Sequence, residues 1–242
     1  MTAFAYEDCP DPIRSDLAEA YREAWDHISG PGTWLTGEER IAVADETRRA
    51  RDCALCRERK QALSPFSVDG EHDHAGLLPA PIVDEIHRVT TDAARLTEGW
   101  YRGLLDEGLS AERYVEALGV AIEVISIDRF HHAMGLPLEP LPCPLPGEPT
   151  RERPEVVEGE AWVPMQTPRR VAELAGMPMR SAPFVVRALS LVPAEVEAWH
   201  SISEAQYLSA HQMTRFGRVR AIDRSQIELV AGRVSALNEC FY

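Results

Sequence analysis

Apolar residues recur at intervals of three or four through most of this chain, which is the spacing of amphipathic helices. Between Pro12 and the pair Gly30-Pro31, for example, the apolar positions fall on one helical face. No stretch alternates apolar and polar residues convincingly, so we predict an all-α fold. The helices expected from this pattern span residues 13–29, 36 to about 63, 81–97, 98–107, 110–134, 168–176, 184–191, 194–209 and 223–242.

Three sequence signals mark where these helices begin and end. Thr36-Gly37-Glu38-Glu39 is a capping-box pattern, in which the threonine oxygen accepts an amide hydrogen and Glu39 bonds back to the start. Asp223-Arg224-Ser225-Gln226 has the same form at the last helix. Ser110 is expected to cap the longest helix, which should end at Gly135.

A proline-rich segment divides the helical pattern. Nine of the chain's 18 prolines lie within residues 136–168, and proline fixes φ and removes an amide donor. We therefore predict an extended linker at 136–168, between an N-terminal helical unit at 1–135 and a second helical domain at 169–242.

Composition narrows the classes of partner. The 242 residues carry 25 basic and 39 acidic side chains, a net charge of −14, which argues against binding to nucleic acid or anionic membranes. No apolar run approaches the length of a membrane span, and residues 1–12 lack the basic and apolar parts of a signal peptide. A cytoplasmic location is the expectation.

Five cysteines are too few and too uneven for a secreted disulfide framework. Cys53 and Cys56 form a C-x-x-C pair, which fits a redox-active dithiol, a metal site or simple core packing. Glu46 could lie near the face of Cys53. Four basic residues could lower a thiol pKa by their charge: Arg51, Arg57, Arg59 and Lys60.

A metal site would need two further ligands. Cys53 and Cys56 with two histidines could build a tetrahedral zinc site. The candidate histidines are His72 and His74 in a polar loop, and His131 and His132 near a helix end. Solvated or structural histidines are the competing interpretation at all four positions, and His87 has no motif around it.

The end of the chain carries a different signal. Glu228 precedes Cys240 by twelve residues, within Ile227–Val230 and Ala236–Tyr242. This spacing, with segments 182–190 and 194–199, resembles the alkylhydroperoxidase D and carboxymuconolactone decarboxylase superfamily. The resemblance implies an all-helical alkylhydroperoxidase D-like fold, usually oligomeric, and reduction of a hydroperoxide by paired thiols. By the same resemblance, Glu228 is the proton-handling carboxylate and Cys240 the first thiol.

The family motif continues with a second cysteine and a histidine, and neither has a counterpart in this sequence. We therefore expect either a domain that is incomplete at its catalytic centre or a following UGA codon that encodes selenocysteine. A weak internal repeat supports two related units, because Glu116 precedes Asp128 by the same twelve residues. In that alignment His131 takes the place of the missing second thiol.

The function expected from these features is that of a thiol peroxidase or disulfide oxidoreductase. Its site residues would be Cys53, Cys56, Glu228 and Cys240, with no cofactor, a small hydroperoxide as substrate and a thiol protein as reductant. Two alternatives remain. One is a zinc-binding structural protein that uses Cys53 and Cys56 with histidines, and the other is a non-catalytic helical oligomerisation module.

Overall fold

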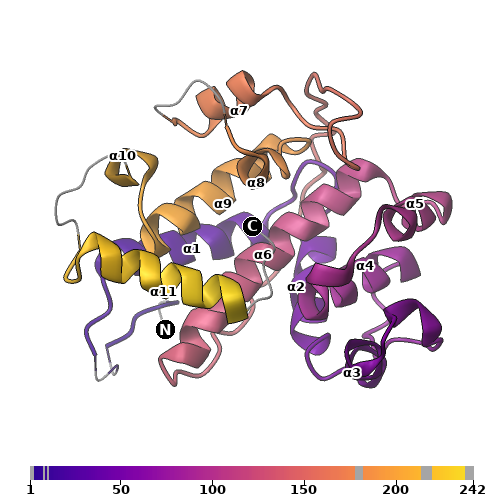
Figure 1. Cartoon of the computed structure of the whole chain (residues 1–242), viewed down its shortest axis with the longest axis horizontal. Coiled ribbons are helices and arrows are strands. Elements are labelled where there is room, and N and C mark those ends of the chain that lie inside the picture. Colours follow the sequence, from indigo (N-terminus) through magenta and orange to yellow (C-terminus); the bar gives the residue numbers. More distant parts are fainter. Residues whose placement is uncertain (1–2, 8, 10, 178–181, 214–219, 238–242) are drawn as a thin grey trace.

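The computed structural model describes residues 3–7, 9, 11–177, 182–213 and 220–237, and over this part of the chain the structure is built from helices (Figure 1). The expectation of an all-α fold is confirmed for these residues, whose single β-bridge joins Val157 to Met165. The helices are α1 (Ser15–Ser29), α2 (Gly37–Arg49), α3 (Ala54–Gln61), α4 (Ala80–Thr91), α5 (Glu98–Asp106), α6 (Ala111–Ala133), α7 (Pro168–Leu174), α8 (Phe184–Arg187), α9 (Pro193–Gln206), α10 (Ala210–Met213) and α11 (Arg224–Leu237), with 3-10 turns at Pro65–Ser67 and Ala93–Arg95.

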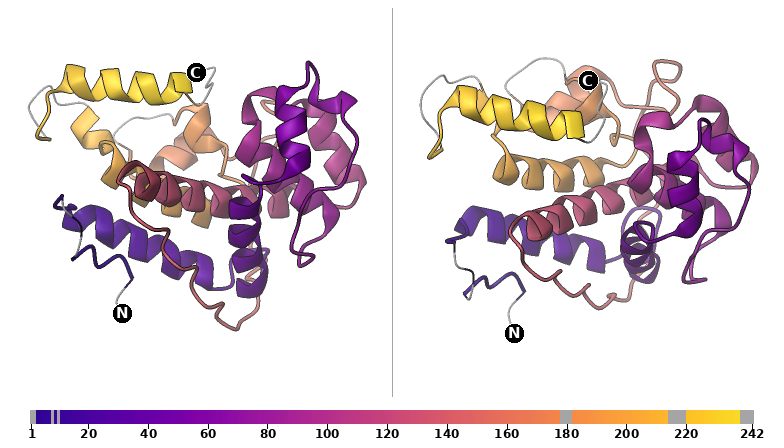
Figure 2. Two further views of the ribbon diagram at one scale, coloured as in Figure 1. Left: turned by 90° about the horizontal axis from the view of Figure 1, so that it is seen from below. Right: turned by 60° about the horizontal axis from the view of Figure 1, so that its bottom comes forward.

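Helix α6 is the centre of the packing. It contacts α9 and α1 along one side and α2 and α4 along the other, as the views in Figures 1 and 2 agree. Apolar side chains from these five helices form a continuous core, in which Tyr21, Val43, Ile86, Val120 and Val196 are each fully buried. The core therefore continues across the proline-rich segment, because α9 contributes to the same cluster as α1 and α6.

The predicted helix ends are confirmed where caps specify them. Thr36 Oγ1 accepts from the amide of Glu39, whose carboxylate accepts in return from the amide of Thr36. Ser110 caps α6, and Gly135 follows that helix with a φ of 67°, a value that glycine adopts without strain. Gln226 and Asp223 make the expected reciprocal bonds at α11.

The helix predicted from Thr36 to about Leu63 is broken into two. Helix α2 ends at Arg49, and a turn at residues 50–53 redirects the chain before α3 begins at Ala54. Cys53 is the N-cap of α3, in an extended conformation, so the two cysteines lie at a break in the predicted helix. Both lie at the start of a new helix.

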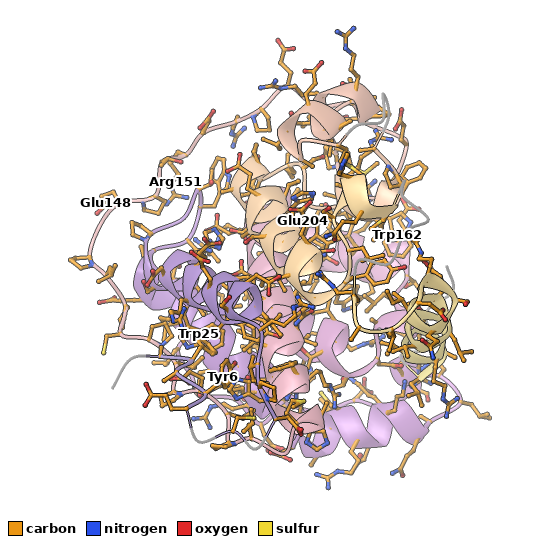
Figure 3. The ribbon with its side chains drawn as sticks, turned by 90° about the vertical axis from the view of Figure 1, so that its left-hand side faces the viewer. Tyr6, Trp25, Glu148, Arg151, Trp162 and Glu204 are labelled. Atoms are coloured by element: carbon orange, nitrogen blue, oxygen red, sulfur yellow. The ribbon has the colours of Figure 1, made fainter. Side chains whose placement is uncertain are left out.

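Residues 136–167 contain no helix, as the prolines predict, but this segment packs against the first part of the chain. The amides of Leu145 and Thr150 donate to the carbonyls of Ser29 and Gly32, and the indole of Trp25 donates to Pro140. Figure 3 shows Glu148 and Arg151 on this extended chain, on the same side of the molecule as Trp25. The segment thus covers the connection between α1 and α2.

Helix α11 is the most weakly buried of the long helices. Leu229, Val230, Val234 and Leu237 on it are exposed, and Ile227 is its buried residue. Cys240 lies outside the described residues, so its predicted role has no structural counterpart to report. None of the described helices combines the length and the apolar character that crossing a bilayer requires.

Candidate metal centre

Four side chains from three neighbouring elements meet beside α4. Cys53 caps α3, Cys56 lies in its first turn, His72 comes from the loop before α4, and His87 lies on α4 itself. Their potential ligand atoms all lie within 4.8 Å of one another. The two cysteines and His87 are buried, and the side chain of His72 is 8% exposed.

Three of the six distances between these ligand atoms are close to the edges of a tetrahedral site, and the other three are at most 4.8 Å. Nδ1 of His72 lies 3.6 Å from Sγ of Cys53 and 3.5 Å from Sγ of Cys56, and Nδ1 of His87 lies 3.2 Å from Sγ of Cys56. Zinc–sulfur bonds of about 2.3 Å and zinc–nitrogen bonds of about 2.0 Å at tetrahedral angles place sulfur and nitrogen about 3.5 Å apart. The side chains need little movement to bind such an ion.

Each histidine is oriented by a carboxylate on its outer nitrogen. Nε2 of His72 lies 2.9 Å from Oδ1 of Asp84, and Nε2 of His87 lies 2.8 Å from Oε1 of Glu46. A carboxylate can only accept, so a hydrogen on Nε2 satisfies this contact and leaves the lone pair of Nδ1 facing the sulfurs. Nε2 of His72 also lies 3.1 Å from Nη1 of Arg59. Carboxylate support of this kind is typical of histidine ligands in metal sites.

Asp84 is held as an anion by its neighbours. It accepts from Arg59 Nη1 at 2.9 Å and from Trp100 Nε1 at 2.6 Å, in addition to His72. Burial acts to raise the pKa of Asp84, but the hydrogen bonds from His72, Trp100 and Arg59 more than offset it and leave that pKa well below its ordinary range. Because Asp84 is ionised at neutral pH, it increases the electron density of the His72 ring, so that Nδ1 of His72 is a better ligand for a cation.

The expected activation of the thiols by basic residues is wrong for Cys56. Burial raises the pKa of Cys56 to about 12, and the charge of Arg59 lowers it only in small part. Arg59 is instead paired with Asp84, and Arg57 bonds the carbonyl of Asp52. A metal ion bound at this place would offset the effect of burial, because it would stabilise the thiolate.

The other predicted site residues lie elsewhere. Glu228 is on the surface of α11, 47% exposed at its side chain, where it accepts from the hydroxyl of Tyr207 at 2.7 Å and pairs with Arg224. Helix α11 and helix α3 lie apart in Figures 1 and 2. The structure thus brings Cys53 and Cys56 together, but it does not bring Glu228 to them.

Of the four histidines considered for a metal site, only His72 joins the cysteines. His74 is two residues away but turns to Glu71 and the amide of Gly76. His131 bonds the hydroxyl of Tyr6 and the carbonyl of Pro137. The fourth member of the cluster is His87, which the sequence analysis did not select because no motif surrounds it.

The one sequence signal that could have indicated His87 is its position on the apolar face of α4. Ile82, Val83 and Ile86 are buried there, and an imidazole on such a face needs a partner. Glu46, which the sequence analysis placed near the face of Cys53, pairs with His87 in the structure.

A second buried polar cluster joins α1, α2, α6 and α9. Nη1 of Arg40 donates to Glu116 at 2.7 Å and to Glu195 at 2.8 Å, and all three side chains are fully buried. Nδ1 of His27 lies 2.8 Å from Glu123, and its Nε2 lies 3.6 Å from Glu195. From their spacing of seven residues, Glu116 and Glu123 would be expected to be solvated or paired with Arg113 or Arg129. This expectation is wrong, because Arg40 of α2 pairs with Glu116 and His27 of α1 pairs with Glu123.

Comparison with family models, with curated proteins and with solved structures finds no match for this chain. The candidate function therefore rests on the residues and the geometry described above.

Proposed function

We propose that this chain is a zinc-binding protein in which Cys53, Cys56, His72 and His87 hold one structural zinc ion. The observation that carries the proposal is the convergence of four ligand atoms within 4.8 Å, three of them from buried residues. Two of the atoms belong to imidazoles whose other nitrogen faces a carboxylate. Two thiolates and two imidazoles are a donor set that zinc prefers.

The ion would be a structural element and not a catalytic one. Four protein ligands complete a tetrahedral zinc site, so no position remains for a substrate or an activated water. Burial of both cysteines and His87 points the same way, because a catalytic ion needs access from solvent. We infer that the ion fastens α3 and the loop of residues 62–79 to α4.

That fastening matters because the attached segment has little apolar core of its own. Cys53, Leu55 and Cys56 form a small cluster with Val68, separate from the main core. A zinc ion that binds the folded segment and not the unfolded one stabilises it by its binding free energy.

The test is the metal content of the reduced protein and of two matched variants. Wild-type protein dialysed against trace zinc and analysed by inductively coupled plasma mass spectrometry is expected to retain about one zinc ion per chain. His72→Asn removes a ligand and should lose the tightly bound ion. His74→Asn, in the same loop but outside the cluster, should retain it. Equal zinc contents in the two variants, or none in the wild type, would contradict the proposal.

Thiol-disulfide or hydroperoxide chemistry at the same cysteines is the second candidate. It is favoured by one observation, the continuous contact from Cys56 Sγ through His87 to Glu46, which is the arrangement of a thiol with an oriented base. Steady-state consumption of hydrogen peroxide in the presence of a dithiol reductant tests it. Turnover that is lost in Cys56→Ser and retained in Cys143→Ser would support catalysis, and the absence of turnover in the wild type would refute it.

A further inference from the structure

The two sulfurs of the proposed zinc site are also placed to react with each other. Both approach the same nitrogen, Nδ1 of His72, at 3.6 and 3.5 Å, and they lie no more than 4.8 Å apart. Cys53 caps α3 and Cys56 lies in its first turn, so the bond would close a short loop. A tetrahedral zinc ion holds two sulfurs about 3.8 Å apart, whereas a disulfide needs about 2.05 Å. The two states therefore exclude one another.

We propose that a hydroperoxide oxidises Cys53 and Cys56 to a disulfide and thereby releases the zinc ion, so that the metal occupancy reports the redox state of the site. This inference rests on the zinc site proposed above. One thiolate attacks the terminal peroxide oxygen, which breaks the O–O bond and gives a sulfenic acid and an alkoxide. The second thiolate attacks the sulfenic sulfur and displaces hydroxide. The two thiolates lose two electrons, the peroxide gains them, and two protons from solvent complete an alcohol and water.

Release follows from what remains to hold the ion. After oxidation only the two imidazoles, His72 and His87, can donate to zinc, and both anionic ligands are gone. The neutral disulfide also removes the charge that balanced the cation in a buried place. Retention of zinc by two neutral ligands would leave the ion without its preferred four donors.

The loop beside the two sulfurs, which carries His72, is largely exposed to solvent. The residues on either side of His72 in this loop are exposed, among them Asp69, Gly70, Glu71 and Asp73. This loop is held to α3 by the bond from the amide of Ala54 to Asp73 at 2.8 Å and by Arg59, which donates to the carbonyl of Val68 at 3.2 Å and lies 3.1 Å from Nε2 of His72. Leu55 packs near Gly70. A small hydroperoxide needs only a local opening of this loop to reach the cysteines.

The loss of zinc should then loosen a defined part of the chain. Within residues 53–78 the small apolar cluster around Leu55 is separate from the main core, which Leu78 joins at the end of the segment together with α2, α4 and α6. We expect faster hydrogen exchange in residues 53–78 after oxidation and unchanged protection in α6.

The experiment uses the full chain with the other thiols replaced: Cys9→Ser, Cys143→Ser and Cys240→Ser together. The reduced, zinc-loaded protein is titrated with hydrogen peroxide, while a zinc-binding dye measures released metal and peptide mass spectrometry measures the Cys53–Cys56 disulfide. We expect about one zinc ion released for each disulfide, with rebinding after reduction by dithiothreitol. Cys53→His in the same background is the matched control. It keeps four donors but cannot form the disulfide, so it should bind zinc and retain it under peroxide.

The outcomes separate the two proposals. A reduced protein that holds no zinc contradicts the zinc site itself and the release with it. A zinc-loaded protein that keeps its metal after peroxide, or that releases it without forming the disulfide, contradicts the release alone. Equal release from the Cys53→His variant would also overturn it, because that variant has no second thiol at the site.

Discussion

Asp84→Asn should weaken zinc binding without removing any zinc ligand. Asp84 accepts from Nε2 of His72 at 2.9 Å, and its pKa is held well below the ordinary range by hydrogen bonds that outweigh burial, so it acts on His72 as an anion. The neutral amide would orient the imidazole less firmly and make its free nitrogen a weaker donor. Loss of such a partner typically reduces metal affinity 10- to 100-fold, which is about 1.4–2.7 kcal/mol.

The size of the effect follows from the rest of the site. Glu46 still supports His87 at 2.8 Å, and both cysteines remain, so four donors are present in the variant. We therefore expect a lower affinity at an unchanged stoichiometry of about one ion per chain. Asp69→Asn is the matched control, because Asp69 is exposed in the loop before His72.

Competition with a chromophoric chelator at fixed pH measures the affinities of the wild type and of both variants. Asp84 also accepts from Trp100 and Arg59, so the melting temperature of the zinc-free proteins is measured beside the affinity. Affinities of Asp84→Asn and Asp69→Asn that agree within twofold would refute the role given to Asp84. Complete loss of zinc with an intact fold would refute it as well, since that is the behaviour of a missing ligand.

Three further predictions concern the buried cluster around Arg40. Gly119→Ala should destabilise the protein by about 1–3 kcal/mol in urea unfolding, because the new Cβ would lie 2.2 Å from Oε2 of Glu195. Gly103→Ala is the control, because a Cβ there has open space on α5, and it should not destabilise the protein. Equal losses of stability in the two variants would contradict the close packing of Gly119 on Glu195. Arg40→Ala should lower the free energy of unfolding by about 3–5 kcal/mol, since it leaves Glu116 and Glu195 buried without their cation. Arg49→Ala on the same helix breaks only the exposed pair with Asp45 and should change the stability little. A similar loss of stability in Arg49→Ala would argue against this role of Arg40. The pKa of His27 is raised in the folded protein above its ordinary 6.5, because the carboxylates of Glu123 and Glu195 outweigh the effects of burial and of Arg40. Protonated His27 therefore stabilises the fold fully below pH 6.5, and this contribution is lost as the pH rises through the folded pKa. Thermal melts of His27→Gln should accordingly show a deficit against wild type at pH 6 that narrows at alkaline pH, and a deficit that widens instead would refute the assignment.

Local signals in the sequence predicted the helices well. The capping residues Thr36 and Ser110 and the terminal Gly135 mark helix ends because their side chain or backbone geometry acts within one turn. The sequence leaves open whether Cys53 and Cys56 lie on one long helix or at a break within it, since the helical pattern continues through them. The packing of α3 against α4, which no local pattern encodes, redirects the chain there.

The site was only half predictable for the same reason. Cys53 and Cys56 are recognisable by their spacing, and His72 was among the candidates. His87 lies on α4, 31 residues after Cys56 in the sequence, and its contact with the sulfur of Cys56 depends on how α3 and α4 pack against each other. The partners of Glu116 and Glu123, which are Arg40 and His27, also lie on other helices, so no local pattern indicates these pairs.

Zinc K-edge X-ray absorption on the reduced, purified chain tests the central claim most directly, because it identifies the atoms around the metal. The account predicts about one zinc ion per chain with two sulfur neighbours near 2.3 Å and two nitrogen neighbours near 2.0 Å. A chain that binds no zinc, or a zinc ion whose neighbours include no sulfur, would contradict it.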